Sequence, residues 1–255
     1  MLTMILAILQ ARVSSTRLPG KVLKPILGVP MILRQIERIQ RAESIDKLIV
    51  ATSMEQSDDE LVDLCEQYGI ECARGSLNDV LDRFYQVAAR YKPDHIVRLT
   101  GDCPLTDPKI IDEVIQKHLT GHYDYTSNTI EPTYPDGLDV EIFRLSCLER
   151  AWQEANIPSQ REHVTLFFYQ HPELFYIGSV KNTMDLSKLR WTVDELEDFL
   201  VVNTIYEQLY PHNSAFSTKD ILDYLNNHDN VGDINSRFTR NEGLIKSLEE
   251  DRINQ

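Results

Sequence analysis

Short apolar segments alternate with amphipathic segments through the first 120 residues of the chain. The apolar segments have the length and composition of strands buried on both faces, and they span residues 5–9, 47–52, 70–74 and 95–101. The segments between them place apolar residues at helical spacing and predict helices over 30–43, 57–69, 78–91 and 108–119. This alternation predicts an α/β fold built from βαβ units around a largely parallel sheet.

The pattern is less regular beyond residue 120. Strands are predicted at 123–128, 138–143, 175–180 and 189–193, and helices at 144–155, 160–170, 195–209 and 217–226. The chain has no internal repeat, low-complexity tract or Gly/Ser-rich linker. It is therefore expected to form a single domain over residues 1–255 that ends in a polar tail, residues 229–255.

The composition is that of a globular protein, since 42% of the 255 residues are hydrophobic and 26% are charged. A net charge of −14 argues against DNA or RNA as a partner, because nucleic-acid binding depends on basic surface. No apolar run approaches the roughly 18 residues that cross a bilayer, and no cleaved signal is recognisable, so we expect a cytoplasmic protein without a membrane partner. The cysteines lack CxxC spacing and are expected to be free thiols: Cys65, Cys72, Cys103 and Cys147.

One segment departs from the acidic background. The first 36 residues contain no Asp or Glu but carry Arg12, Arg17, Lys21, Lys24 and Arg34. A turn rich in hydroxyl groups follows the first predicted strand here, and its free backbone N–H groups and cations would suit a polyphosphate, which predicts a nucleotide site. A solvated surface loop is the alternative. The chain has neither GxxxxGK followed by Ser or Thr nor GxGxxG after a strand, which argues against a P-loop kinase and a standard dinucleotide dehydrogenase.

Two aspartates directly follow predicted strands: Asp102 in LTGDCPL and Asp194 in RWTVDELEDF. Ligands of parallel α/β sheets gather at the carboxyl ends of strands, and Mg²⁺ prefers carboxylate and phosphate oxygens. The two aspartates are therefore candidate Mg²⁺ ligands beside a polyphosphate. A turn residue or helix cap is the alternative for each, because Asp is common in both roles.

Two further polar clusters lie in the second half of the chain. DGLDVEIF carries Asp136, Asp139 and Glu141, and SQREHVT carries Arg161 and His163. Asp139 and Glu141 are two apart on a predicted strand and so share one face, and an arginine can bind a carboxylate through two hydrogen bonds. These clusters could contact a ligand or form a structural ion pair with each other. No GxSxG motif or credible Cys/His pair indicates a nucleophilic site.

Six motifs in order resemble those of one enzyme family: QARVSSTRLPGKVL, RGSLNDVLDRF, VRLTGDCPL, DGLDVEIF, REHVT and RWTVDELEDF. It is the cytidylyltransferase family that includes spore coat polysaccharide biosynthesis protein F and is related to CMP-sialic acid and CMP-Kdo synthetases. The resemblance covers about residues 4–225. It implies a nucleotidyltransferase fold of glycosyltransferase-A type, a Rossmann-like sandwich with a mixed, mainly parallel sheet. Residues 1–120 would bind the nucleotide, and residues 121–228 the sugar and a second subunit.

The resemblance also implies roles for single residues. Arg12, Lys21 and Asp102 would be catalytic, and Asp102 and Asp194 would bind Mg²⁺. The implied nucleotide contacts are Gln10, Ala11, Arg12, Arg17, Lys21, Arg74, Asn78, Asp79 and Thr100. The implied sugar contacts are Asp136, Asp139, Glu141, Arg161 and His163.

The implied reaction is attack by a sugar hydroxyl or a sugar phosphate on the α-phosphorus of CTP, with release of pyrophosphate. Members of the family commonly use an acidic 2-keto sugar, whose carboxylate Arg161 or His163 would bind, and are often homodimers. The alternatives are the same fold acting with GTP, UTP or a sugar 1-phosphate, and a nucleotide-binding protein without catalysis. The presence of Arg12, Lys21 and both aspartates argues against a protein that has lost catalysis.

Overall fold

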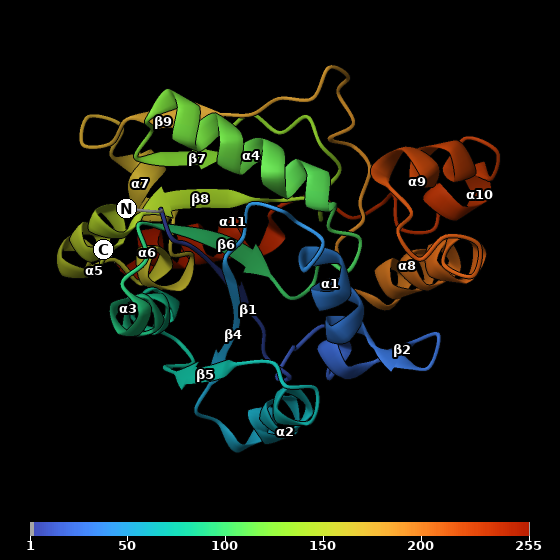
Figure 1. Ribbon diagram of the computed structural model, residues 1–255, viewed down its shortest axis with the longest axis horizontal. Coiled ribbons are helices and arrows are strands. Elements are labelled where there is room, and N and C mark those ends of the chain that lie inside the picture. Colours follow the sequence, from blue (N-terminus) through green and yellow to red (C-terminus); the bar gives the residue numbers. More distant parts are fainter. Residues whose placement is uncertain (1–2, 255) are drawn as a thin grey trace.

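A seven-stranded sheet forms the centre of the computed structural model, which describes residues 3–254. Its order is β5-β4-β1-β6-β8-β7-β9 (Figure 1). Only β8 runs antiparallel to its neighbours β6 and β7, so the sheet is mixed and mainly parallel, as predicted. The strands are β1 Ile5–Gln10, β4 Lys47–Ser53, β5 Cys72–Gly75, β6 His95–Thr100, β7 Tyr125–Ser127, β8 Glu141–Arg144 and β9 Ile177–Ser179. A separate ribbon pairs β2 Pro25–Ile26 with β3 Val29–Pro30.

Helices cover both faces of the sheet. One core contains side chains of α1 Met31–Ile39, α2 Asp59–Gln67, α4 Pro108–Gly121, α8 Leu196–Leu209 and α9 Thr218–Leu225. The other contains side chains of α3 Val80–Tyr91, α5 Leu145–Glu154 and α7 Leu166–Gln170. The remaining helices are α6 Pro158–Glu162, α10 Asp229–Gly232, α11 Glu242–Asn254 and the short 3-10 turns η1 Lys21–Leu23 and η2 Gln56–Asp58.

Strand β1 shows how the sequence builds this sandwich. Ile5, Ala7 and Leu9 point into one core, and Leu6 and Ile8 point into the other. Successive side chains of a strand face opposite sides, so a strand with helices on both faces must be apolar throughout. This is why the apolar segments of the first 120 residues were sufficient to predict the parallel strands.

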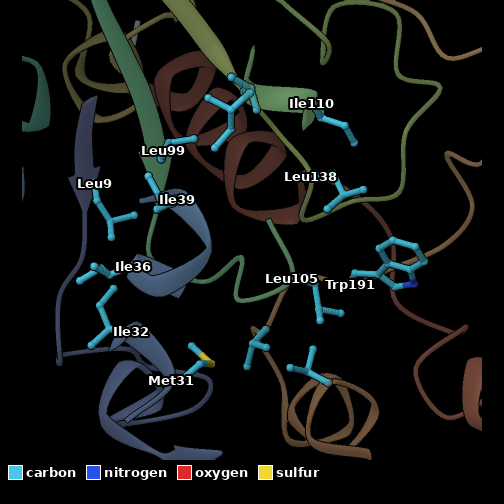
Figure 2. Packing of buried hydrophobic residues seen from close by; sticks show 14 of the residues in the cluster. Leu9, Met31, Ile32, Ile36, Ile39, Leu99, Leu105, Ile110, Leu138 and Trp191 are labelled. Carbon is cyan, nitrogen blue, oxygen red and sulfur yellow. The ribbon is translucent and has the colours of Figure 1, made fainter. Parts of the chain in front are cut away.

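The larger core extends from the first half of the chain into the second. Figure 2 shows Leu9 and Leu99 of the central strands near Ile36 of α1, and Leu138 and Trp191 in the same cluster. Strand β6 also pairs directly with β8, so one sheet contains strands from both halves of the chain. Helices α8, α9 and α10 contact one another and form a group at the right in Figure 1.

The strand predicted at 189–193 is wrong. This segment makes one isolated bridge, between Asp136 and Arg190, instead of a ladder. The pairing ends because the chain turns at Gly137, whose φ is +103° and whose missing side chain admits the backbone of Thr192: a Cβ there would lie 2.4 Å from the Thr192 nitrogen.

Two other predicted elements are divided or shortened. The helix predicted at 160–170 is broken into α6 and α7 at Val164, which has a φ of +50° and cannot continue a right-handed helix. The strand predicted at 138–143 begins only at Glu141. Asp139 therefore precedes β8, and the two acids do not share one strand.

The polar tail is ordered on the body of the molecule, with α11 against α6. The four cysteines are free thiols. Within residues 3–254, no helix combines the length and apolar character needed to cross a membrane.

Candidate active site

The carboxyl ends of β1 and β6 border a cavity of about 510 Å³. These strands end at Gln10 and Thr100, which are paired in the sheet, so the loop and turn that follow start side by side. Gly101 allows the loop after β1 and the turn after β6 to pack closely, because a Cβ at this position would clash with the Cβ of Ala11 at 2.8 Å. The predicted nucleotide contacts that line this cavity are Gln10, Ala11, Arg12, Arg17, Lys21, Asn78 and Thr100.

A buried carboxylate holds the basic loop after β1. Asp58 is fully buried and accepts hydrogen bonds from the backbone N–H of Val13 at 2.7 Å and of Ser53 at 3.1 Å. Burial would raise the pKa of Asp58, but the hydrogen bonds from Ser53 and Val13 hold it below its usual range. Gly20 closes the loop with a φ of +70° and donates to the Val13 carbonyl at 3.0 Å. The sequence did not single out Asp58.

Lys21 joins the two predicted metal ligands. Its Nζ lies 3.3 Å from Oδ2 of Asp102, 2.9 Å from Oδ1 of Asp194 and 2.7 Å from the carbonyl oxygen of Val193. Burial would lower the pKa of Lys21, but the charges of Asp102 and Asp194 raise it, so the side chain remains an ammonium ion. Carboxylates from distant segments thus share one cation.

Neither aspartate caps a helix, although Asp102 does lie in a turn, as the alternative for it allowed. Asp107 caps α4, and Glu195 and Asp198 form the capping box of α8. The side chains of Asp102 and Asp194 are left to face the cleft, which both of them line.

The two carboxylates are donors of the kind that Mg²⁺ prefers, and Asp194 is paired with Arg17 at 2.7 Å as well as with Lys21. Burial would raise the pKa of Asp102, but the charge of Lys21 and hydrogen bonds from Thr100 and Cys103 lower it to about 2, so Asp102 is ionised at neutral pH. Among the described residues no three His, Cys, Asp or Glu side chains gather as a metal site. Asp102 and Asp194 would therefore share the ion with substrate oxygens and water, which is how Mg²⁺ commonly binds with phosphates.

A second cavity, of about 430 Å³, adjoins the first. The predicted sugar contacts that line it are Asp136, Asp139, Glu141 and His163. The residues that line both cavities are Gln10, Arg17, Arg98, Thr100, Asp102, His163 and Asp194. The cavities therefore form one cleft, and the candidate metal ligands lie where they meet.

Arg190 connects this junction to the second cavity and was missed by the sequence analysis. Its side chain is 5% exposed and donates hydrogen bonds to Asp198 at 2.9 Å, Asp136 at 3.0 Å and Asp194 at 3.1 Å. Burial would lower the pKa of Arg190, but the hydrogen bond to Asp198 and the charges of the three carboxylates raise it. One guanidinium thus positions acids of both cavities.

Glu141 is a second buried junction. It accepts hydrogen bonds from the hydroxyls of Tyr125 at 2.5 Å and Thr165 at 2.7 Å, and pairs with Arg98. Arg98 in turn donates to Oε1 of Gln10 at 3.0 Å. The acid wall of the second cavity is thereby linked to the end of β1. The motif REHVT contributes Thr165 to this network, which sequence reasoning did not foresee.

The tail forms part of the second cavity, which the sequence did not predict. Arg240 pairs with Asp139 and donates to the carbonyl of Tyr134 at 3.1 Å, and Glu242 lies 3.3 Å from Arg17. Burial raises the pKa of Asp139 to about 7, with Arg240 opposing and neighbouring acids adding to the shift. The tail residues that line the cavity are Thr239, Asn241, Glu242, Gly243 and Leu244.

Three predicted site residues line neither cavity: Arg74, Asp79 and Arg161. Arg74 forms an ion pair with Asp59 at 2.7 Å, and Arg161 forms one with Asp79 at 2.6 Å. The ion pair considered between the clusters of Arg161 and Asp139 does not form, because each binds another partner.

A family model described as Cytidylyltransferase matches residues 6–230 of the chain. The chain belongs to the cytidylyltransferase family. It is a nucleotidyltransferase, as the motifs implied. The spore coat polysaccharide biosynthesis protein SpsF of Bacillus subtilis is 35% identical over 216 residues, which are 80% of this chain and 87% of that protein.

Solved structures agree with this cytidylyltransferase assignment. A cytidylyltransferase from Leptospira borgpetersenii is 32% identical and superposes with a TM-score of 0.85 over 90% of this chain and 97% of its own. CMP:2-keto-3-deoxy-manno-octonic acid synthetase complexed with CTP is 17% identical and shares the fold, with a TM-score of 0.64 over 81% of this chain and 99% of its own.

Proposed function

We propose that this cytidylyltransferase transfers CMP from CTP to a sugar and releases pyrophosphate, with Mg²⁺ as its cofactor. The observation that carries the proposal is the cleft, in which two cavities meet at Asp102 and Asp194. The larger cavity, beside the basic loop, would hold CTP, and the smaller would hold the sugar. The names of the relatives support it, since one acts in polysaccharide biosynthesis and another was solved with CTP.

The reaction needs alignment and charge stabilisation rather than a covalent enzyme intermediate. A hydroxyl oxygen of the sugar attacks the α-phosphorus and gives up its proton to solvent, and the bond between that phosphorus and the pyrophosphate oxygen breaks, so pyrophosphate leaves with the electron pair. Arg17 and Lys21 line the nucleotide cavity and place positive charge beside the phosphates. A Mg²⁺ ion held by Asp102 and Asp194 would supply further positive charge at the phosphate oxygens.

We further propose an acidic 2-keto sugar as the acceptor. Its carboxylate needs a cation, and Arg17, Arg98 and Arg190 line the smaller cavity. Arg161 does not line it, and burial lowers the pKa of His163 despite its acidic neighbours, which leaves that imidazole neutral at pH 7. His163 is therefore suited to a sugar hydroxyl. Of the three arginines that line the cavity, Arg98 and Arg190 are buried against carboxylates, so Arg17, whose side chain is 37% exposed, is the one suited to the sugar carboxylate.

Pyrophosphate release tests the proposed reaction. The purified protein is incubated with Mg²⁺, each of CTP, GTP, UTP and ATP, and a panel of acidic octulosonic and nonulosonic sugars beside neutral hexoses. We expect release only with CTP and an acidic sugar, and none without Mg²⁺ or in the variant Asp102→Asn. Equal release with all four nucleotides, or release that needs no sugar, would contradict the proposal.

A further inference from the structure

One arginine where the two cavities meet contacts three carboxylates of the protein. Arg17 lines both cavities, and its side chain is 37% exposed. Its Nη2 lies 2.7 Å from Asp194, its Nη1 3.3 Å from Glu242 and its Nε 3.6 Å from Glu195. Each guanidinium nitrogen therefore has an acidic neighbour. A carboxylate of the acceptor must take the place of one of these acids to bind Arg17 through two hydrogen bonds.

Two of the three acids are held by other contacts. Asp194 also pairs with Lys21 at 2.9 Å and with Arg190 at 3.1 Å, and it is a candidate Mg²⁺ ligand. Glu195 belongs to the capping box of α8. Neither can turn away from its place without the loss of an interaction on which the metal site or the helix depends.

Glu242 is the acid that is free to move. It is the first residue of α11, and its side chain is 38% exposed. One oxygen accepts from the backbone N–H and the hydroxyl of Thr239, each at 3.2 Å, and the other faces Arg17. Water can replace the contacts of a group as exposed as this. Helix α11 itself stays anchored, because Ser247 contacts His163 at 2.9 Å and the helix packs against α6 (Figure 1).

The tail also carries Glu242 across the smaller cavity. On one side Arg190 donates to the carbonyl of Thr239 at 3.1 Å, and on the other His163 contacts Ser247. Arg190, His163 and Glu242 all line this cavity. The Glu242 carboxylate thus stands in the space proposed for the acceptor, against the cation proposed for the carboxylate of the acceptor.

We propose that the carboxylate of Glu242 occupies Arg17 in place of the acceptor's carboxylate, and that an acidic 2-keto sugar must displace it to bind. The inference rests on the proposed function and adds a tail residue that limits the affinity for the acceptor. Only the fraction of molecules in which Glu242 has left Arg17 can bind the sugar carboxylate, so the apparent affinity is reduced by that fraction. An acidic sugar exchanges one carboxylate for another, whereas a neutral sugar has none to offer Arg17.

Steady-state kinetics with the fastest acidic sugar of the panel measure this exchange. We expect Glu242→Gln to lower the KM for that sugar about two- to fivefold, the fold-change that one exposed ion pair supplies, and to leave the KM for CTP unchanged. The amide keeps an oxygen for Thr239 but carries no charge for Arg17. Glu249→Gln changes an exposed acid of the same helix that lines neither cavity, so this matched control should behave as wild type.

A smaller ligand tests the same exchange without catalysis. Pyruvate carries the 2-keto carboxylate on three carbons, and pyruvamide is its neutral counterpart. In titrations followed by NMR line broadening, pyruvate should bind Glu242→Gln about two- to fivefold more tightly than wild type, and pyruvamide should bind both alike. Glu242→Ala serves if the Gln variant does not fold.

Three results of the pyruvate titration would overturn the inference. Pyruvate could bind wild type and a folded variant equally, or bind neither of them. Pyruvamide could gain as much affinity as pyruvate, which would indicate that the substitution frees space and exchanges no charge.

The kinetic outcomes separate this inference from the proposed function. If no acidic sugar releases pyrophosphate from CTP, the proposed acceptor fails, and the inference fails with it. If an acidic sugar is used and its KM is the same in wild type and Glu242→Gln, the proposed function stands and only the role of Glu242 is lost. A fall in the KM for CTP alone would mean that Glu242 opposes the phosphates, which also overturns the inference.

Discussion

At the scale of single residues, the cleft is organised by cations that each hold several carboxylates. The Lys21 ammonium contacts Asp102 and Asp194, and Arg190 contacts Asp194 and Asp136. Carboxylates that lie close together repel one another and tend to take up protons, and the Lys21 charge opposes this at Asp102, whose pKa it lowers. Ionised oxygens are what a hard metal ion requires.

Removing the Lys21 ammonium should therefore impair the site through its acids as well as through lost phosphate contacts. We expect Lys21→Ala to lower the turnover of CTP by about a hundredfold or more, the usual effect of deleting one charge-stabilising group. The pKa of Asp102, about 2 in the native protein, should rise. Initial rates of pyrophosphate release at neutral pH measure the lost turnover, and rates at acidic pH, where only a raised pKa lets Asp102 take up a proton, measure the second effect. Lys24→Ala removes a cation of the same segment that lines neither cavity and should act as wild type.

The residue types of the site could be predicted from the sequence, but the direction of each side chain could not. Arg74 was expected to frame the nucleotide, yet its guanidinium binds Asp59 outside the cleft. The partner is set by the packing of α2 against β5, which no local pattern displays. Arg83 also lines the larger cavity, and this could have been predicted, because it lies three residues after Val80 and so shares its helix face.

At the scale of elements, prediction succeeded where a segment is apolar on both faces and failed where distant contacts decide the backbone. β4, expected at 47–52, spans Lys47–Ser53. The segment 189–193 was predicted as a strand, but its backbone is set by the buried ion pairs of Arg190 with Asp136 and Asp198, which lie elsewhere in the chain. A helical pattern likewise runs through Val164, although the chain turns there and brings Thr165 to Glu141.

Loss of Arg240 from the tail segment 239–244 should weaken binding of the acceptor and leave binding of the nucleotide unchanged. Arg240 lines neither cavity itself, but it pairs with Asp139, which lines the smaller cavity proposed for the acceptor, and this part of the chain lies beyond the family match at residue 230. We expect Arg240→Ala to raise the KM for the acceptor about tenfold, because Asp139 loses the charge-assisted contact that holds it at the cavity wall, with the KM for CTP unchanged.

A neighbouring arginine supplies the control for the tail. Arg237 is 69% exposed and pairs with Glu197, which, unlike Asp139, lines neither cavity, so Arg237→Ala should leave both KM values as in wild type. Equal changes in the two KM values of Arg240→Ala would contradict a role at the acceptor. Initial rates with one substrate held saturating separate the two constants.

At the scale of the whole molecule, the α/β class followed from the alternation of segments, whereas the mixed sheet came only from the family resemblance. The reason is that β8, late in the chain, enters the sheet between β6 and β7. The position of β8 depends on its pairing with β6, about 40 residues earlier in the chain, and a local hydrophobic pattern does not reveal which strands pair. The insertion of β8 also shapes the second cavity, because Glu141, the first residue of β8, lines it.

The same insertion places a buried histidine pair between α4 and the sheet. His118 is fully buried, with Nδ1 3.0 Å from the hydroxyl of Thr126 and Nε2 2.9 Å from Nδ1 of His95. Burial, then the charges of His95 and Arg144, lower the pKa of His118 to about 3. The imidazole is therefore neutral in the folded protein down to about pH 3, whereas in the unfolded chain it takes up a proton near pH 6.5.

Stability should consequently fall in acid partly through His118. Its contribution is fully present above about pH 6.5 and is lost as the pH falls toward 3, at no more than about 1.4 kcal/mol per pH unit. His118→Gln removes this slope, so the difference in free energy of unfolding between wild type and variant should shrink from pH 7 to pH 5. Urea denaturation at each pH measures it, and the exposed His212→Gln should track wild type throughout. A difference that stays constant with pH would mean that His118 stabilises the fold by packing alone, because a titrating group must change its contribution as its unfolded form gains a proton.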